Sequence, residues 1–244
     1  MRILILSDVH ANLAALEAVL QDAGNFDMIW SLGDIVGYGP DPNACITRLN
    51  DFEHLAIAGN HDWGVLGKID LADFNPDARQ ANLWTREQLT PQSFAYLQSL
   101  PEKLIQGDFT LAHGSPRHPI WEYILHESIA KINFTHFETT FCLVGHTHVP
   151  IIFQYDTETS RCLAAMPPER EPFQLETNRY RYIINPGGVG QPRDGDPRAA
   201  YMLLDLEEKV FEYRRVSYDI AATQKKMRAA GLPFRLIARL ELGW

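Results

Sequence analysis

Residues 2–60 alternate three short apolar runs with two helical patterns, and this rhythm restricts the fold more than any other feature of the sequence. The runs RILILS, MIWSLG and HLAIAG have the length and composition of buried strands. Between them, residues 13–24 and 41–49 carry the apolar period of helices, and Asn12 is in position to cap the first. This β-α-β-α-β order predicts a largely parallel sheet covered by helices.

The remainder of the chain shows two further sequence patterns, first a helical one and then one typical of β-strands. Residues 63–100 contain two Asn-Pro or Thr-Pro helix starts, which predicts a small helical insertion. From about residue 151 onward, apolar segments alternate with turns, as they do in antiparallel strands. A parallel half followed by an antiparallel half suggests two packed sheets. The expected fold class is α/β in the α+β sense, a four-layer αββα sandwich of two mixed β-sheets flanked by helices, with residues 1–244 as a single domain.

Residues 219–244 form a C-terminal tail with the pattern of two helices broken at Gly231-Leu232-Pro233. Their apolar stripe is expected to pack on the tail's own domain. The alternative is that this stripe forms an oligomer contact.

The composition limits the partners. With 22 Lys and Arg against 31 Asp and Glu, the net charge is −9, so neither duplex nucleic acid nor a membrane surface is expected as the main partner. A phosphate ligand must therefore meet local positive charge. No apolar run approaches the ~20 residues of a membrane span. The three cysteines form no C-x-x-C spacing, which favours a reducing, cytoplasmic location.

Each of five predicted strands leads into residues that can bind a metal ion. In chain order, these residues are Asp8, His10, Asp34, Asn60, His113, His146 and His148. If the strands share one sheet, the side chains converge beyond its carboxyl edge. Residues i and i+2 of an extended segment face the same side, so D-V-H and H-T-H would each present two ligands to one small volume.

This mixed set of nitrogen and oxygen donors indicates transition metals. The set is too rich in imidazole for Ca²⁺ or Mg²⁺, and we expect Mn²⁺ first, with Fe, Zn, Ni and Co as the other candidates. Seven ligands are too many for one catalytic ion with an open position, but they suit two ions that share a bridging carboxylate. The structural alternative is that the acidic and amide groups cap helices and the histidines serve packing alone.

The motifs D-V-H, G-D, G-N-H-D, H-G and G-H-T-H, in this order over residues 8–148, resemble those of the calcineurin-like metallophosphoesterases. The resemblance implies a first metal held by Asp8, His10 and His148. It implies a second metal held by Asn60, His113 and His146, with Asp34 bridging the two. His61 would then be a histidine outside both coordination sets that faces the leaving group, or one that only orients a ligand.

Two further stretches narrow the resemblance. NPGGVGQPRD (185–194) and GDIVGYGPDPN resemble a bacterial branch described as diadenosine-tetraphosphatase-like or as predicted phosphodiesterases, although Gly188 stands where that branch often has serine. Arg193, together with Gly187 and Gly188, is a candidate substrate-binding group for an anion. The alternative is a plain turn stabilised by an Arg–Asp pair.

One departure bears on the substrate. Protein phosphatases of this superfamily carry an arginine shortly after the bridging aspartate, whereas this chain has Tyr38 there, and Asp62 replaces their glutamate. A bidentate arginine is hard to replace, so a specialised phosphoprotein phosphatase is disfavoured.

The predicted function is that of a dinuclear metal-dependent phosphoesterase acting on a small phosphorylated substrate, with phosphodiesters expected first. A metal-bridging hydroxide would attack phosphorus, with Asp34 holding both ions and His61 protonating the leaving oxygen. The alternatives are a diadenosine-polyphosphate hydrolase and a phosphoprotein or monoester phosphatase. A non-catalytic interaction module on the same fold is the alternative from another class.

Overall fold

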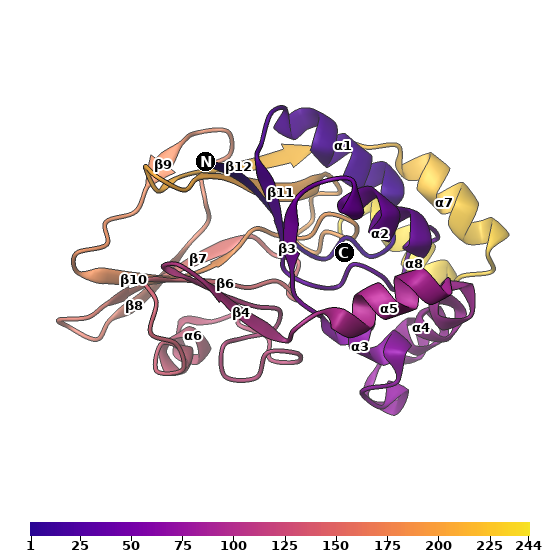
Figure 1. The fold of residues 1–244 in the computed structure, drawn as a ribbon, viewed down its shortest axis with the longest axis horizontal. Coiled ribbons are helices and arrows are strands. Elements are labelled where there is room, and N and C mark those ends of the chain that lie inside the picture. Colours follow the sequence, from indigo (N-terminus) through magenta and orange to yellow (C-terminus); the bar gives the residue numbers. More distant parts are fainter.

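A computed structural model describes all residues, 1–244, and contains two six-stranded sheets (Figure 1). The first sheet has the order β3 (His54–Ala56), β2 (Met28–Ser31), β1 (Arg2–Leu6), β11 (Ala199–Asp205), β12 (Val210–Val216) and β9 (Phe173–Gln174). The second has the order β4 (Lys103–Gln106), β5 (Phe109–Ala112), β6 (Phe141–Leu143), β10 (Tyr180–Asn185), β7 (Ile151–Asp156) and β8 (Cys162–Ala165).

Both sheets are mixed, and both draw strands from the two halves of the sequence. In the first sheet β1, β2 and β3 are parallel, and β11 joins β1 in antiparallel register, with Leu4 opposite Leu203. In the second sheet β5, β6 and β10 are parallel, while β4 and β7 run antiparallel to their neighbours. The strands after residue 151 pair with one another in antiparallel register as expected, but β10 is also parallel to β6, and each sheet combines strands of both halves. Strand pairing is not confined to neighbours along the chain, so the order of patterns could not assign strands to sheets.

The layers follow from the two-residue alternation of β1. Ile3 and Ile5 point into the core between the sheets, whereas Leu4 and Leu6 point into a second core beneath the helices. The helices α1 (Leu13–Ala23) and α2 (Pro42–Asn50) cover that outer face, and α6 (Glu127–Asn133) covers the other sheet. The predicted αββα sandwich is confirmed.

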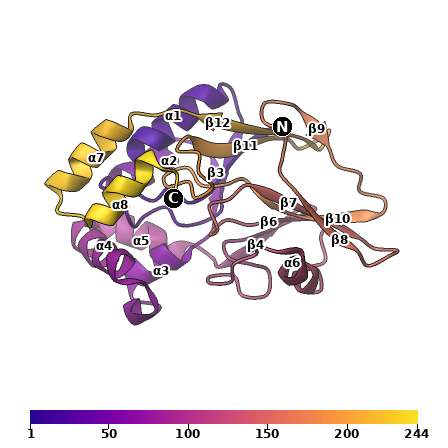
Figure 2. The same cartoon turned by 180° about the vertical axis from the view of Figure 1, so that it is seen from behind.

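The insertion and the tail meet at one end of the sandwich (Figures 1 and 2). The insertion comprises α3 (Asn60–Leu66), the 3-10 helix η1 (Leu71–Asp73), α4 (Pro76–Gln88) and α5 (Pro91–Ser99). The tail comprises α7 (Ile220–Ala229), α8 (Phe234–Ala238) and the 3-10 helix η2 (Arg239–Glu241). Both contribute to one buried cluster, in which Leu236, Ile237 and Leu240 lie with Phe74 and Tyr38. The apolar stripe of the tail thus packs within its own chain.

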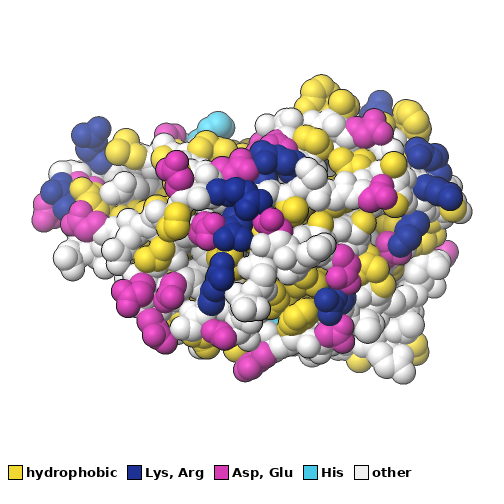
Figure 3. Space-filling model, turned by 90° about the horizontal axis from the view of Figure 1, so that it is seen from above, with side chains coloured by type: hydrophobic (Ala, Val, Ile, Leu, Met, Phe, Trp, Pro, Cys, Tyr) yellow, Lys and Arg dark blue, Asp and Glu magenta, His cyan; other side chains and the backbone are white.

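None of the helices combines the length and the apolar composition that crossing a membrane requires. On the face seen from above, basic side chains lie beside acidic ones (Figure 3).

Asn12 joins three segments behind the carboxyl ends of the strands. Its Oδ1 accepts a hydrogen bond from Ala15 N at 3.3 Å, which confirms the predicted cap of α1. The same oxygen accepts a bond from the Thr223 hydroxyl of α7 at 3.0 Å, and Asn12 Nδ2 donates to the Gly190 carbonyl at 2.9 Å. One buried amide therefore fastens a helix, the tail and the loop before Arg193.

We expect Asn12→Ala to lower the free energy of unfolding by about 2–4 kcal/mol, because it removes a helix cap and leaves buried polar groups unpaired. Thr223→Val removes one of the three bonds and should cost about 1 kcal/mol. Chemical denaturation of the two variants measures both. Equal losses would show that Asn12 acts only through α7.

Candidate metal centre

The seven predicted ligands lie together at one end of the sandwich, although their strands belong to different sheets. Asp8, Asp34 and Asn60 follow β1, β2 and β3 of the first sheet, while His113 and His146 follow β5 and β6 of the second. The assumption of a single sheet is therefore wrong. The predicted ligands still converge, because the parallel strands of both sheets end on the same side. The cluster therefore lies where the carboxyl ends of the two sets of strands meet.

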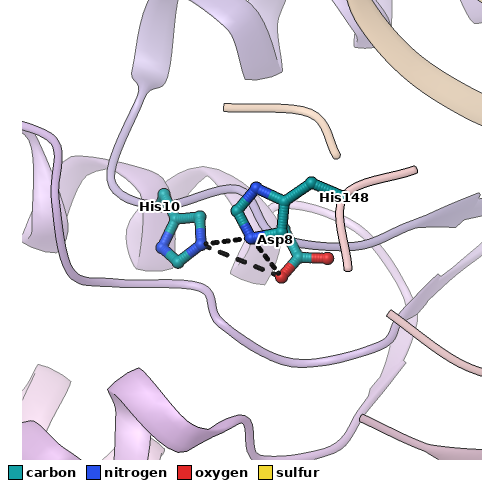
Figure 4. A group of neighbouring side chains, drawn as sticks. All are labelled: Asp8, His10 and His148. Atoms are coloured by element: carbon teal, nitrogen blue, oxygen red, sulfur yellow. Dashed lines mark hydrogen bonds and ion pairs between the residues drawn. The ribbon is translucent and has the colours of Figure 1, made fainter. Parts of the chain in front are cut away.

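One group consists of Asp8, His10 and His148, all buried (Figure 4). The Nε2 atom of His148 lies 3.1 Å from Asp8 Oδ1 and 3.1 Å from His10 Nε2. Two imidazole nitrogens and one carboxylate oxygen thus point at a common space. These are the residues that the sequence resemblance implies for a first metal.

A second group consists of Asp34, His113 and His146, also buried. Asp34 Oδ2 lies 3.3 Å from His113 Nε2 and 3.6 Å from His10 Nε2, so it stands between the two groups. The Asn60 amide oxygen lies 3.1 Å from His113 Nε2. The arrangement matches the implied second set, with Asp34 in a bridging position.

The backbone at these ligands is not extended. Five of the seven have positive φ angles between 48° and 65°: Asp8, His10, Asp34, His146 and His148. The D-V-H and H-T-H segments therefore deliver their side chains through left-handed turns, and the two histidines of H-T-H serve different groups. The prediction that these segments are extended and present both side chains to the same side was therefore wrong. Such conformations cost about 1–3 kcal/mol each and concentrate at functional sites.

Each ligand imidazole has its other nitrogen against a main-chain carbonyl. His10 Nδ1 lies 3.2 Å from Val36 O, and His113 Nδ1 lies 2.8 Å from Leu32 O. His148 Nδ1 contacts Gln191 O, and His146 Nε2 lies 3.1 Å from Trp121 O. A nitrogen that donates to a carbonyl leaves the opposite nitrogen free for a metal, which is the usual support of metal-bound histidines.

The carboxylates of Asp8 and Asp34 each have one oxygen that a metal ion could coordinate. Asp8 Oδ2 accepts bonds from Ser7 Oγ and His146 N, and Asp34 Oδ1 accepts one from His61 N. Their second oxygens, Asp8 Oδ1 and Asp34 Oδ2, are buried and have no well-formed hydrogen bond, and they face the imidazole nitrogens of His148 at 3.1 Å and His113 at 3.3 Å. Unpaired buried oxygens are costly, so the donor set fits two cations.

The protonation states favour ligation for most of these groups. Burial lowers the pKa values of His10, His146 and His148, which keeps their imidazoles neutral. Burial also opposes the charged forms of Asp8 and Asp34, but neighbouring histidines outweigh it and lower both carboxyl pKa values. His113 differs, because Asp34 overcomes burial and raises its pKa to about 9. Metal binding would displace that proton.

Glycines allow the ligand loops to touch. A Cβ on Gly59 would lie 2.1 Å from Asp34 Oδ1 and 2.4 Å from Asp34 N, and one on Gly145 would lie 1.9 Å from Ser7 Oγ. The Asp62 carboxylate ties the same loops by accepting bonds from Gly59 N at 2.9 Å and Val36 N at 3.1 Å. Side chains at these glycines would push the ligands apart.

His61 lies within the cluster, with one ring nitrogen less than 4.8 Å from ligand atoms of His10 and Asp34. Its Nδ1 is bonded to Asn82 Oδ1 of α4 at 2.8 Å, so Nε2 is the free nitrogen. Burial lowers the pKa of His61 to about 4. Sequence reasoning missed Asn82, because nothing in a helical pattern shows that one polar residue turns into the site.

A pocket of about 180 Å³ adjoins the cluster. It is lined by His61, by four of the predicted ligands, by Arg193 and by the aromatic residues Tyr38, Phe74, Trp121 and Tyr123. Tyr123 stacks on His146 with ring centroids 3.9 Å apart. Trp121 and Tyr123 were not predicted, because the loop that carries them has no motif.

Arg193 lies beside Tyr38, the residue at the sequence position where the protein phosphatases carry an arginine. Its Nη2 lies 3.3 Å from the Tyr38 hydroxyl, and the neighbouring Asp194 pairs with Arg215 instead of with Arg193. The alternative of a turn held by a local Arg–Asp pair is therefore wrong. A cation does stand beside Tyr38, but it comes from the other half of the chain.

Gly187 and Gly188 lie away from the pocket. A Cβ on Gly187 would lie 2.8 Å from Ala200 Cβ, and one on Gly188 would lie 3.0 Å from His148 Cβ. They support the loop behind a ligand and do not face a substrate. In that loop Gly190 N donates to Asp8 O at 2.9 Å, a contact that brings Arg193 to the pocket.

The model of the calcineurin-like phosphoesterase superfamily domain matches residues 1–209. The chain belongs to the calcineurin-like phosphoesterase superfamily. This membership confirms the resemblance drawn from the motifs. It supports a metal-dependent hydrolase that acts on phosphoesters, and the clustered Asp and His side chains are able to hold the metal ions.

Individual relatives agree with the membership. The crystal structure of a metallophosphoesterase from Sphaerobacter thermophilus is 53% identical with a TM-score of 0.90, and the match covers 100% of this phosphoesterase and 99% of that chain. An uncharacterised protein from Methanocaldococcus jannaschii is 39% identical, over 99% of this chain and 98% of its own. A hypothetical protein from Pyrococcus horikoshii OT3, 20% identical, shares the fold with a TM-score of 0.79 over 100% of this chain and 98% of its own.

We expect Gly59→Ala to lower occupancy of both metals without changing a ligand, because the added methyl group displaces Asp34 from its place between the groups. Asp34→Asn should cause the same double loss. Elemental analysis of manganese-loaded protein measures the stoichiometry. Gly107→Ala, in the β4–β5 turn, is the control for a glycine replacement away from the cluster: its Cβ would meet nothing within 4 Å, and its φ of +56° adds only local backbone strain. Full occupancy in Gly59→Ala would contradict the bridging position of Asp34.

Proposed function

We propose that this phosphoesterase holds two divalent transition-metal ions, Mn²⁺ being the best suited, and hydrolyses small phosphodiesters. The observation that carries the proposal is the pair of buried, unbonded oxygens, Asp8 Oδ1 and Asp34 Oδ2, with four anchored imidazoles around them. Asp34 would bridge one ion held by Asp8, His10 and His148 and another held by Asn60, His113 and His146. When bound, the ions would neutralise phosphate charge and lower the pKa of a water molecule between them.

Arg193 supplies the protein's own cation for the phosphate. Its contacts are with uncharged groups, the Tyr38 hydroxyl at 3.3 Å and the Gln191 amide oxygen at 3.4 Å, and its Nε has no partner. A phosphoryl oxygen can replace these long contacts with shorter, charge-assisted hydrogen bonds. Arg193 would thus orient the substrate against the metal cluster.

His61 would protonate the leaving oxygen through its free Nε2. Asn82 fixes the ring by holding Nδ1 at 2.8 Å, and His61 lines the same pocket as Arg193. Burial disfavours the imidazolium, but the negative charge of a bound phosphoester stabilises it. Asn82 therefore acts as a positioning residue, and His61 as the proton donor.

The pocket favours small diesters over the larger alternatives. A volume of about 180 Å³ is below the roughly 300–1,000 Å³ of sites for drug-sized ligands, so this pocket alone holds a small diester, and a diadenosine polyphosphate or a phosphoprotein segment would have to extend beyond it. Its aromatic walls offer packing surface for an esterified organic group. A monoester is the second candidate. Position 38 carries tyrosine where the protein phosphatases carry an arginine, but Arg193 supplies a cation beside it. A non-catalytic module would not need the complete ligand set.

We expect the manganese-loaded protein to hydrolyse bis(p-nitrophenyl) phosphate with a higher kcat/KM than p-nitrophenyl phosphate. The diester offers a second ring to the aromatic walls of the pocket, whereas the monoester has only one. Initial rates on both substrates, at equal metal content, test the order. A clear preference for the monoester would favour a monoester phosphatase.

We expect His61→Ala to retain both metals but to lose turnover by roughly 10²–10⁴-fold on a diester with an alkoxide leaving group, the usual contribution of a general acid. The loss should shrink for nitrophenoxide, which leaves without a proton. Asn82→Leu should lose about 10–100-fold on the alkoxide. Kinetics on the two leaving groups, with metal content measured alongside, check this. Equal losses on both would show that His61 only stabilises charge.

A further inference from the structure

A second cavity lies beside the reaction pocket. Its volume is about 560 Å³, and it opens between the first turn of α4 and the C-terminal helices, lined among others by Asn75, Asp77, Arg235, Arg239 and Trp244. Asn75 lines both cavities. The two cavities therefore adjoin at Asn75, the N-cap of α4.

Positive charge faces this space. Arg239 donates from Nε to the main-chain oxygen of Trp244 and pairs with no Asp or Glu side chain. Burial lowers the pKa of Arg239, and the positive charge of Arg193 lowers it further. Many other arginines pair with carboxylates, as in the Arg170–Asp22 pair, and basic side chains lie beside acidic ones on the face in Figure 3. Against Arg235 and Arg239, the cavity has one acidic side chain, Asp77.

The walls of this cavity are held in place before any ligand binds. Leu236, Ile237 and Leu240 of the tail are buried with Phe74 and Tyr38. Tyr38 in turn contacts Arg193 through its hydroxyl. The tail therefore packs directly on the residues that line the reaction pocket, and the position of Arg239 relative to Arg193 is fixed by this shared core.

We propose that the cavity under the C-terminal helices is a second subsite, in which Arg239 binds a further anionic group of the substrate. The inference rests on the proposed function and deepens it. The substrate would be a phosphoester whose organic part ends in an oxyanion, either a phosphate or a carboxylate, held by Arg239 while Arg193 and the metal cluster hold the scissile phosphate. Arg239 is a specificity-determining residue in this arrangement and does not touch the reacting atoms.

The first test uses manganese-loaded protein and phosphodiesters with a common p-nitrophenyl leaving group. Their second chain ends in methyl, carboxylate or phosphate, and its length is increased stepwise. We expect the KM of at least one charged substrate to be about tenfold below that of its methyl counterpart, the effect of one charge-assisted hydrogen bond. Arg239→Gln should bring the two KM values together, whereas Arg228→Gln, on the exposed side of α7, should preserve the difference. The better end group identifies the anion.

The second test measures binding without turnover. Calorimetry compares alkylphosphonates with phosphonates of equal length that end in carboxylate or phosphate, on wild type and Arg239→Gln. An advantage of the charged phosphonates that disappears in Arg239→Gln supports the subsite, even if the diesters are not hydrolysed, an outcome that would count against the proposed function alone. Hydrolysis with equal KM values for all end groups would overturn the subsite and leave the proposed function standing.

Discussion

The Asp34 carboxylate connects the two sheets at the site, and the arrangement of the cluster depends on it. Oδ1 accepts a bond from His61 N at 2.8 Å, which orients the start of α3. Oδ2 lies between His10 of the first sheet and His113 of the second. The residue's own carbonyl accepts a bond from His10 N at 2.9 Å. A single side chain thus sets the separation of the two ligand groups, which explains why its neighbour at position 59 must be glycine.

The left-handed turns at the ligands require compensation from the main chain. Asp8 N donates to Gly33 O at 3.1 Å, and Gly190 N donates to Asp8 O at 2.9 Å, so the strained Asp8 is held from both sides. This close approach requires glycine at position 190, because a Cβ there would lie 1.9 Å from Val9 O. Strain persists where surrounding structure over-determines it. The glycine-rich 185–190 segment therefore serves the metal centre as a brace, not as an anion pocket.

The sequence predicted what depends on local pattern. The helix after Asn12 and the clustering of the seven candidate ligands were predictable, because periodicity and strand ends are encoded by near neighbours. Sheet membership was not predictable, because β11 pairs with β1 across most of the chain. Asn82 and Arg239 lie on helices whose residues reach the site only through tertiary packing. No spacing along a single sequence distinguishes them from ordinary surface positions.

The position of Arg193 at the pocket depends on the C-terminal tail through Tyr38. In this chain Tyr38 follows the bridging aspartate, and its hydroxyl and ring pack against Arg193 from residues 185–194. Tyr38 is also buried against Leu236 and Leu240, so its ring cannot move without moving the tail. An arginine at position 38 would reach the phosphate without support from other segments. With tyrosine there, the position of the Arg193 guanidinium depends on the loop of Tyr38, on residues 185–194 and on the tail. Residues beyond the 209 that the family model matches thereby help to hold the wall of the pocket beside the cluster.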